Sequence, residues 1–137
     1  YEAGDVGRDC FRGRGEMEVE MAHWQAVGLE HMLDEGAMQR LDLEGVSVLL
    51  ARVGGVYYAT QELCPHARSH LSTGRLAGPI VTCAAHGSQF DVTTGACVAW
   101  VADLPGIVRR AAQALAKSRD LITYPTRVLD GQVWVLV

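Results

Sequence analysis

Two Cys-His pairs in one glycine-rich stretch constrain the fold of this chain more than any other feature of its sequence. The first pair is Cys64-x-His66 and the second is Cys83-x-x-His86, with sixteen residues between them. Each pair offers one thiolate and one imidazole, which are metal-binding groups. The glycines and prolines around both pairs indicate loops. We therefore expect a fold that brings two loops to one cofactor.

Patterns typical of β-strands flank this stretch on both sides. The segment "VSVLLARVGGVYYATQ" contains two runs rich in β-branched and aromatic residues, separated by Gly54-Gly55 in the manner of a hairpin turn. The closing "ITYPTRVLDGQVWVLV" repeats this arrangement, with Asp130-Gly131 as the turn. The sequence therefore predicts an antiparallel base sheet from roughly 21 to 61 and 121 to 137.

One helix is predicted, within the segment from 100 to 119. Apolar residues recur there at helical spacing, at Leu104, Val108, Ala111, Ala112 and Leu115. Pro105 suits a first helical turn, since its missing N–H would have no partner there.

Composition and charge exclude several classes of protein. With 137 residues, 49% of them hydrophobic, the chain is expected to form one domain, at 21–137, after a flexible arm at 1–20. We expect neither a membrane span nor a secretory signal. The net charge of −4 disfavours nucleic-acid binding. Four widely spaced cysteines suit a reducing compartment better than a disulfide scaffold, so we expect a cytoplasmic protein.

The two loops and their flanks together resemble the Rieske family. The resemblance covers almost all of 21–137 and rests on "CPHARSHLSTGRL", "VTCAAHGSQFDVTTG" and "YPTRVLDGQVWVLV", which look like Rieske-type ferredoxins. It implies an all-β fold, namely a Rieske-type antiparallel β-sandwich with a small cluster-binding subdomain at about 62–98. The helical insertion, at about 103–118, is an addition to that fold.

The resemblance also implies one 2Fe-2S cluster per chain, with Cys64 and Cys83 on the inner iron and His66 and His86 on the outer, more exposed iron. Two neutral imidazoles in place of two thiolates make the cluster less negative, so that it accepts an electron more readily. Such centres have reduction potentials of about −150 to +300 mV, against about −400 mV for plant-type ferredoxins. The implied chemistry is one-electron transfer at moderate potential.

Residues near the implied cluster indicate a position within that range. Respiratory Rieske proteins bridge their two loops through a further cysteine in each, whereas the matching positions here hold Ser69 and Ala85. They also place a serine and a tyrosine whose hydroxyls bond to sulfur; Ser88 matches the first, and Phe90 replaces the second. Hydrogen bonds to sulfur stabilise the reduced cluster, so losing one lowers the potential. We expect a low-potential ferredoxin.

The insertion at 100–119 departs from the family, in which a short loop covers the cluster. Here we expect Trp100, Leu104 and Pro105 to cover it on one side. The helix that follows is expected either to pack on the sheet as a lid, with its charges solvated, or to dock an acidic partner. Four basic residues favour the second alternative, at Arg109, Arg110, Lys117 and Arg119, with no acid between 105 and 119.

The resemblance favours an electron carrier between a reductase and a terminal oxygenase or reductase. A second hypothesis is a redox subunit that resembles the small subunit of nitrite reductase and is bound permanently in a larger complex, through 100–119. A remote alternative is an interaction module with a Cys2His2 zinc site. No mononuclear-iron triad of two histidines and a carboxylate is evident, so we expect no catalytic site.

Overall fold

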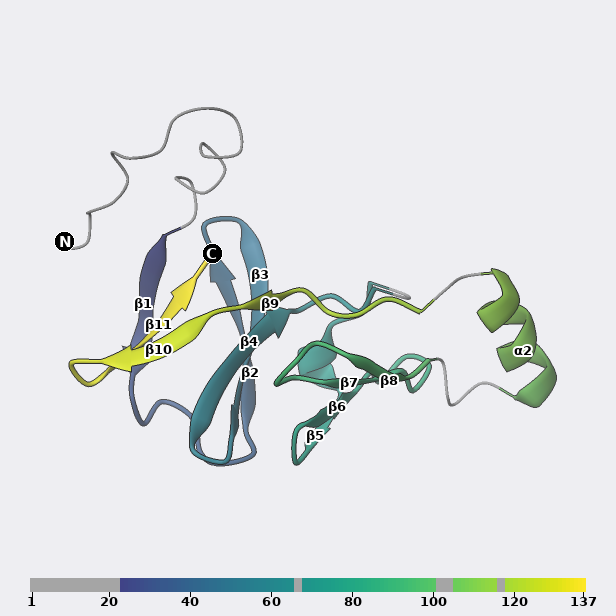
Figure 1. The fold of residues 1–137 in the computed structure, drawn as a ribbon, viewed down its shortest axis with the longest axis horizontal. Coiled ribbons are helices and arrows are strands. Elements are labelled where there is room, and N and C mark those ends of the chain that lie inside the picture. Colours follow the sequence, from purple (N-terminus) through teal and green to yellow (C-terminus); the bar gives the residue numbers. More distant parts are fainter. Residues whose placement is uncertain (1–22, 66–67, 101–104, 116–117) are drawn as a thin grey trace.

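The computed structural model describes residues 23–65, 68–100, 105–115 and 118–137, so the arm expected at 1–20 lies outside the described residues. Its base consists of two antiparallel sheets (Figure 1). One contains β1 (Trp24–Leu29), β10 (Thr126–Leu129) and β11 (Gln132–Leu136) in the order β1-β11-β10. The other contains β2 (Met38–Leu43), β3 (Val46–Val53), β4 (Val56–Gln61) and β9 (Thr123–Tyr124) in the order β2-β3-β4-β9.

Both hairpin predictions are confirmed. Strands β3 and β4 meet at the pair Val53 and Val56, and the two glycines between them have φ values of 63° and 79°. Strands β10 and β11 join through Asp130 and Gly131, whose φ values are 54° and 76°. Positive φ at both central residues is what a type I′ turn requires, and it matches the twist of the strands it joins.

Strand β3 is buried on both faces, because the base sheet lies between two cores. Val48 and Leu50 pack with Val133 and Val135 of β11 in the core of the base. The alternate residues, Leu49 and Ala51, point to the opposite face and belong to a second core. That second core lies under the two loops that contain Cys64 and Cys83.

A third antiparallel sheet contains β5 (Arg75–Ala77), β6 (Ile80–Thr82), β7 (Gln89–Asp91) and β8 (Cys97–Ala99), in sequential order. It carries the second of these loops, between β6 and β7, and the first loop lies between β4 and this sheet in the chain. A short 3-10 helix, η2 (Leu71–Thr73), precedes the sheet. In Figure 1 this unit lies beside the base. In the sequence, it is inserted between strands β4 and β9 of the base. The three sheets confirm the predicted all-β, Rieske-type fold.

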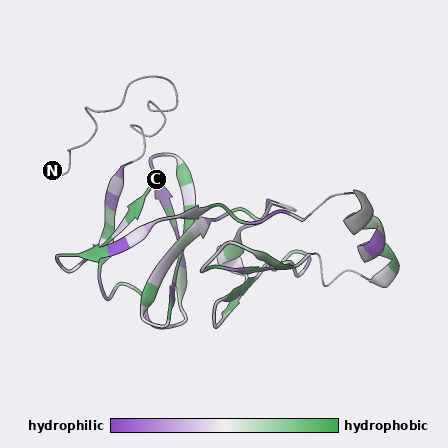
Figure 2. Cartoon of the chain, in the orientation of Figure 1, coloured by the Kyte–Doolittle hydropathy of each residue, from purple (hydrophilic) through white to green (hydrophobic). Residues whose placement is uncertain are grey.

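Helix α2 (Gly106–Leu115) confirms the predicted helical insertion. Figures 1 and 2 show that it stands away from the sheets, beyond the loop-bearing end of the molecule, and carries both hydrophobic and hydrophilic residues. Ile107 exposes 81% of its surface and Val108 48%. The described side chains of α2 therefore do not form the lid on the sheet that was one of our two expectations. Within the described ranges, no helix is long and apolar enough to cross a membrane.

Candidate metal centre

The first loop closes on itself around Cys64. The Cys64 N–H donates to the carbonyl of Ser69 at 2.8 Å, and the Arg68 N–H donates to the carbonyl of Cys64 at 2.7 Å. Arg68 adopts a left-handed conformation, with φ at 57°. A bridge between Leu63 and His70 ties the two ends of the loop together. His66 lies outside the described residues.

The second loop, between β6 and β7, repeats this pattern around Cys83. The Cys83 N–H donates to the carbonyl of Ser88 at 2.8 Å, and the Gly87 N–H donates to the carbonyl of Cys83 at 3.1 Å. Gly87 has φ at 77°, at the position that Arg68 occupies in the first loop. Two loops of matching backbone geometry therefore each present one cysteine.

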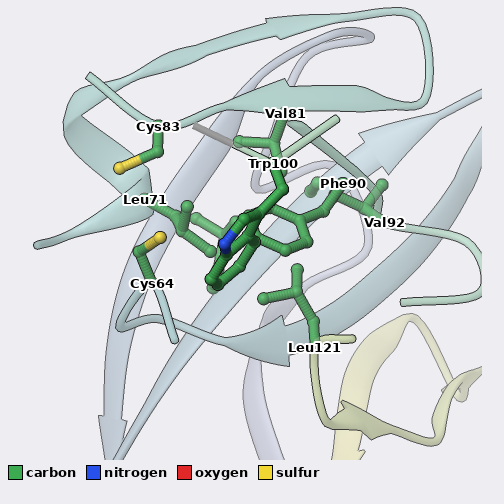
Figure 3. Packing of buried hydrophobic residues seen from close by; sticks show 10 residues of the cluster. Cys64, Leu71, Val81, Cys83, Phe90, Val92, Trp100 and Leu121 are labelled. Atoms are coloured by element: carbon green, nitrogen blue, oxygen red, sulfur yellow. The ribbon is translucent and has the colours of Figure 1, made fainter. Parts of the chain in front are cut away.

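The two cysteines belong to the same core cluster. Figure 3 shows their sulfur atoms at one edge of the core beneath the loops. Both residues are buried, with 0% of Cys64 and 2% of Cys83 exposed, and neither is in a disulfide. The Ser69 hydroxyl of the first loop lies 2.9 Å from the Cys83 sulfur of the second. The fold thus brings the two loops to one place, as the sequence predicted.

Aromatic side chains form part of the apolar core under the cysteines. Phe90 is fully buried and meets Trp100 edge to face, with ring centroids 6.5 Å apart (Figure 3). The remaining members of this core come from the base and from the loop-bearing unit, at Leu49, Ala51, Leu71, Val81, Val92 and Leu121. Such packing excludes water from the inner side of the site.

The outer side of the site is more open. His86 is half-buried, and its neighbours Ala84 and Ala85 are exposed. Ser88, by contrast, is 1% exposed and lies at the end of the second loop. Leu104 lies outside the described residues, and Pro105 is exposed, immediately before α2. The site therefore has thiols on its buried side and an imidazole toward solvent.

A buried carboxylate beside the first loop was not anticipated from the sequence. Glu62 is 0% exposed and accepts hydrogen bonds from the Ser72 N–H at 3.2 Å and from the Ser72 hydroxyl. His70 Nδ1 lies 3.1 Å from the same carboxylate. The Glu62 carbonyl also accepts from the Leu71 N–H, so this residue anchors the returning arm of the loop. Glutamate is rarely buried without partners, and nothing in "QELCPH" marks it as buried.

The donor set suits a two-iron cluster. Two buried cysteines can each bind as thiolates from the protein side, while the half-buried His86 can bind from the solvent side. In the part of the chain that the structure describes, which omits His66, no three Cys, His, Asp or Glu side chains converge as one metal ion would require. A binuclear cluster divides its ligands between two irons and does not need such convergence.

Comparison with protein families gives one match over most of the chain. The model of the Rieske [2Fe-2S] domain matches residues 23–118. The ferredoxin component of the naphthalene 1,2-dioxygenase system of Pseudomonas putida is 39% identical over 111 residues, which is 81% of this chain and 91% of the relative. Ferredoxin CarAc of Metapseudomonas resinovorans is 36% identical over 73 residues, 53% of this chain and 68% of the relative.

Solved structures agree with these relatives. The ferredoxin of carbazole 1,9a-dioxygenase from Nocardioides aromaticivorans IC177 superposes with a TM-score of 0.67 at 25% identity, over 82% of this chain and 95% of that one. A chain in the complex of reduced oxygenase and oxidized ferredoxin in carbazole 1,9a-dioxygenase gives a TM-score of 0.66 at 25% identity, over 81% and 99%.

Proposed function

Since the chain belongs to the Rieske [2Fe-2S] domain family and carries single electrons without a catalytic site of its own, we propose that it links a reductase to the terminal oxygenase of a dioxygenase system. The observation that carries this proposal is the pair of matching loops, which present buried Cys64 and Cys83 on one side and half-buried His86 on the other. The ferredoxin components among the relatives support the choice of partners.

We propose Cys64, His66, Cys83 and His86 as the cluster ligands. The cluster, when bound, supplies a one-electron couple at moderate potential. The buried cysteines would hold the cluster against the apolar core. The half-buried position of His86 supports the expectation that the histidine-ligated iron faces solvent and the partner. Electrons would then enter and leave through the exposed edge of the site.

Four further residues are proposed to act around the cluster. The burial of Ser88 supports a hydroxyl held close to the ligand sulfurs. The burial of Phe90 and Trp100 supports their role in excluding water from the inner side of the site. Pro105 stays a prediction, because its exposure before α2 neither supports nor opposes a place over the cluster.

The domain division is proposed as the sequence suggested it, with one Rieske domain at 21–137, its cluster-binding subdomain at about 62–98 and its insertion at 100–119. The separate sheet β5–β8 supports this division.

We also propose a cytoplasmic location. None of the described cysteines, at positions 64, 83 and 97, is in a disulfide, which agrees with a reducing compartment.

Helix α2 is proposed as the element that meets the redox partner. Ile107, Val108 and Arg110 are exposed, and the helix stands beyond the loop-bearing end of the molecule (Figure 1). The segment is basic in a chain of net charge −4, so a partner with an apolar groove edged by carboxylates would complement it. The exposed apolar residues also support the alternative of a permanently bound subunit, because a stable interface would bury them.

The proposal can be tested by supplying a reductase and a terminal oxygenase of a naphthalene 1,2-dioxygenase system without their own ferredoxin. We expect the reductase to reduce this chain and the oxygenase to reoxidise it, as followed by visible absorption in a stopped-flow instrument. If the system's own ferredoxin is reoxidised and this chain is not, the oxygenase assignment is wrong.

The role of α2 needs a matched pair of charge reversals. Arg110→Glu should slow transfer to the partner, and added salt should slow the wild-type protein, since exposed charges are screened beyond about 10 Å at 0.1 M. Arg40→Glu makes the same charge change on β2 of the base and should have little effect. Equal rates for the two variants would show that α2 does not dock the partner.

A further inference from the structure

We propose that the Ser69 hydroxyl donates a hydrogen bond to the Cys83 sulfur, and that this contact joins the two ligand loops and raises the reduction potential of the cluster. The inference rests on the proposed role of Cys83 as a ligand. It assigns a role to a residue that lies outside the four ligands and outside the other residues proposed around them.

Ser69 contacts both loops at once. Its backbone carbonyl accepts a hydrogen bond from the Cys64 N–H at 2.8 Å, within the first loop. Its side-chain oxygen lies 2.9 Å from the Cys83 sulfur, across the gap to the second loop. Because positions 69 and 85 are serine and alanine, no disulfide can join the loops at these positions. The hydroxyl contact therefore provides a non-covalent connection.

The chemistry of the ligand fixes the direction of this hydrogen bond. As a free thiol, Cys83 could donate to Ser69 or accept from it. A cysteine that binds iron is a thiolate and has no proton to give. The Ser69 O–H must then be the donor, and a hydrogen bond to a charged acceptor is stronger than one between neutral groups.

A donor at this sulfur favours the reduced state. Reduction adds one negative charge to the cluster, and part of that charge resides on the sulfur ligands. The hydrogen bond strengthens as charge accumulates on its acceptor, so it stabilises the reduced form more than the oxidised form. Cys83 is 2% exposed, so water has little access to replace the donor.

The test compares Ser69→Ala with the wild-type protein, both loaded with cluster, in a dye-mediated redox titration. At the potential that leaves the wild type half reduced, we expect the ratio of reduced to oxidised Ser69→Ala to be about three- to tenfold lower. A tenfold change corresponds to about 59 mV for a one-electron couple. Ser47→Ala removes a hydroxyl from β3 of the base, where it donates to Asp42 at 3.0 Å, and it should leave the ratio nearly unchanged.

A second pair separates the hydroxyl from the shape of the side chain. Ser69→Thr keeps the donor, and Ser69→Val is close to threonine in shape but has no donor. We expect threonine to retain the wild-type potential and full iron content, and valine to lower the potential or lose cluster. Equal potentials and iron contents for these two variants, or equal shifts in Ser69→Ala and Ser47→Ala, would overturn the inference. If the wild-type protein itself bound no two-iron cluster, the proposed function would fail first.

Discussion

Replacing Gly74 with alanine tests how closely the start of β5 packs against the segment that carries Cys83. A Cβ atom at Gly74 would overlap the carbonyl oxygen of Thr82 and would lie 3.0 Å from its carbonyl carbon and 3.3 Å from the Ala84 nitrogen. These atoms belong to the backbone on both sides of Cys83, so no side-chain rotation can relieve the overlap. The backbone of the second loop must therefore move.

The size of the effect follows from this overlap. Inserting one methyl group into a well-packed site costs typically about 1–3 kcal/mol, and here the displaced atoms are backbone, so we expect about 3 kcal/mol. For a chain of this length that corresponds to a fall of about 10 °C in Tm. Movement of Thr82 also disturbs the hydrogen bond from Cys83 to Ser88, so Gly74→Ala should contain less iron per chain.

The assay is thermal unfolding followed by circular dichroism, together with iron analysis of the purified protein. Gly106→Ala is the matched control, because a Cβ atom there has no heavy atom within 4 Å and the residue is helical. It should change stability by no more than about 1 kcal/mol. A Gly74→Ala protein with wild-type Tm and full iron content would refute the packing that positions Cys83.

Three other predictions follow from single side chains. His86→Cys should keep a cluster but lower its potential sharply in a voltammetric titration, because a thiolate adds about one negative charge; an unchanged potential would mean that His86 is not a ligand. Two backbone N–H groups of the β3–β4 turn lower the pKa of Glu35 from its ordinary value of 4.5, so its contribution to stability is present above that value and is lost as the pH falls through the lowered pKa. Calorimetry should show a smaller loss of Tm on acidification for Glu35→Gln than for the wild type, and parallel losses would contradict this. Burial, and then the charge of Asp120, raise the pKa of the Cys97 thiol above 9.0, so alkylation near neutral pH should be slow and should quicken in Asp120→Asn, as measured by mass spectrometry.

The parts of the fold that the sequence predicted are those fixed by local chemistry. Gly54-Gly55 and Asp130-Gly131 adopt positive φ at low cost, so these pairs determine where the hairpins turn. The cysteines at 64 and 83 were recognisable because few other roles explain a thiol and an imidazole so close in two glycine-rich loops.

The features that the sequence did not predict depend on contacts between distant segments. The run "VSVLLARV" indicates a strand, but it does not show that its two faces line two different cores. The burial of Glu62 depends on partners eight and ten residues away, at His70 and Ser72. The position of α2 away from the sheets was also unpredictable, because helical spacing of apolar residues is equally typical of a helix that packs on its own domain.

The most direct test of the central claim is pulsed electron paramagnetic resonance of the reduced protein, combined with iron and sulfide analysis. We predict a [2Fe-2S] cluster whose unpaired electron couples to two directly bound nitrogen nuclei, one from His66 and one from His86. In His86→Cys one of the two couplings should disappear while the cluster remains. A wild-type cluster without directly bound nitrogen, or a protein that binds zinc and no iron, would contradict the assignment of a Rieske cluster.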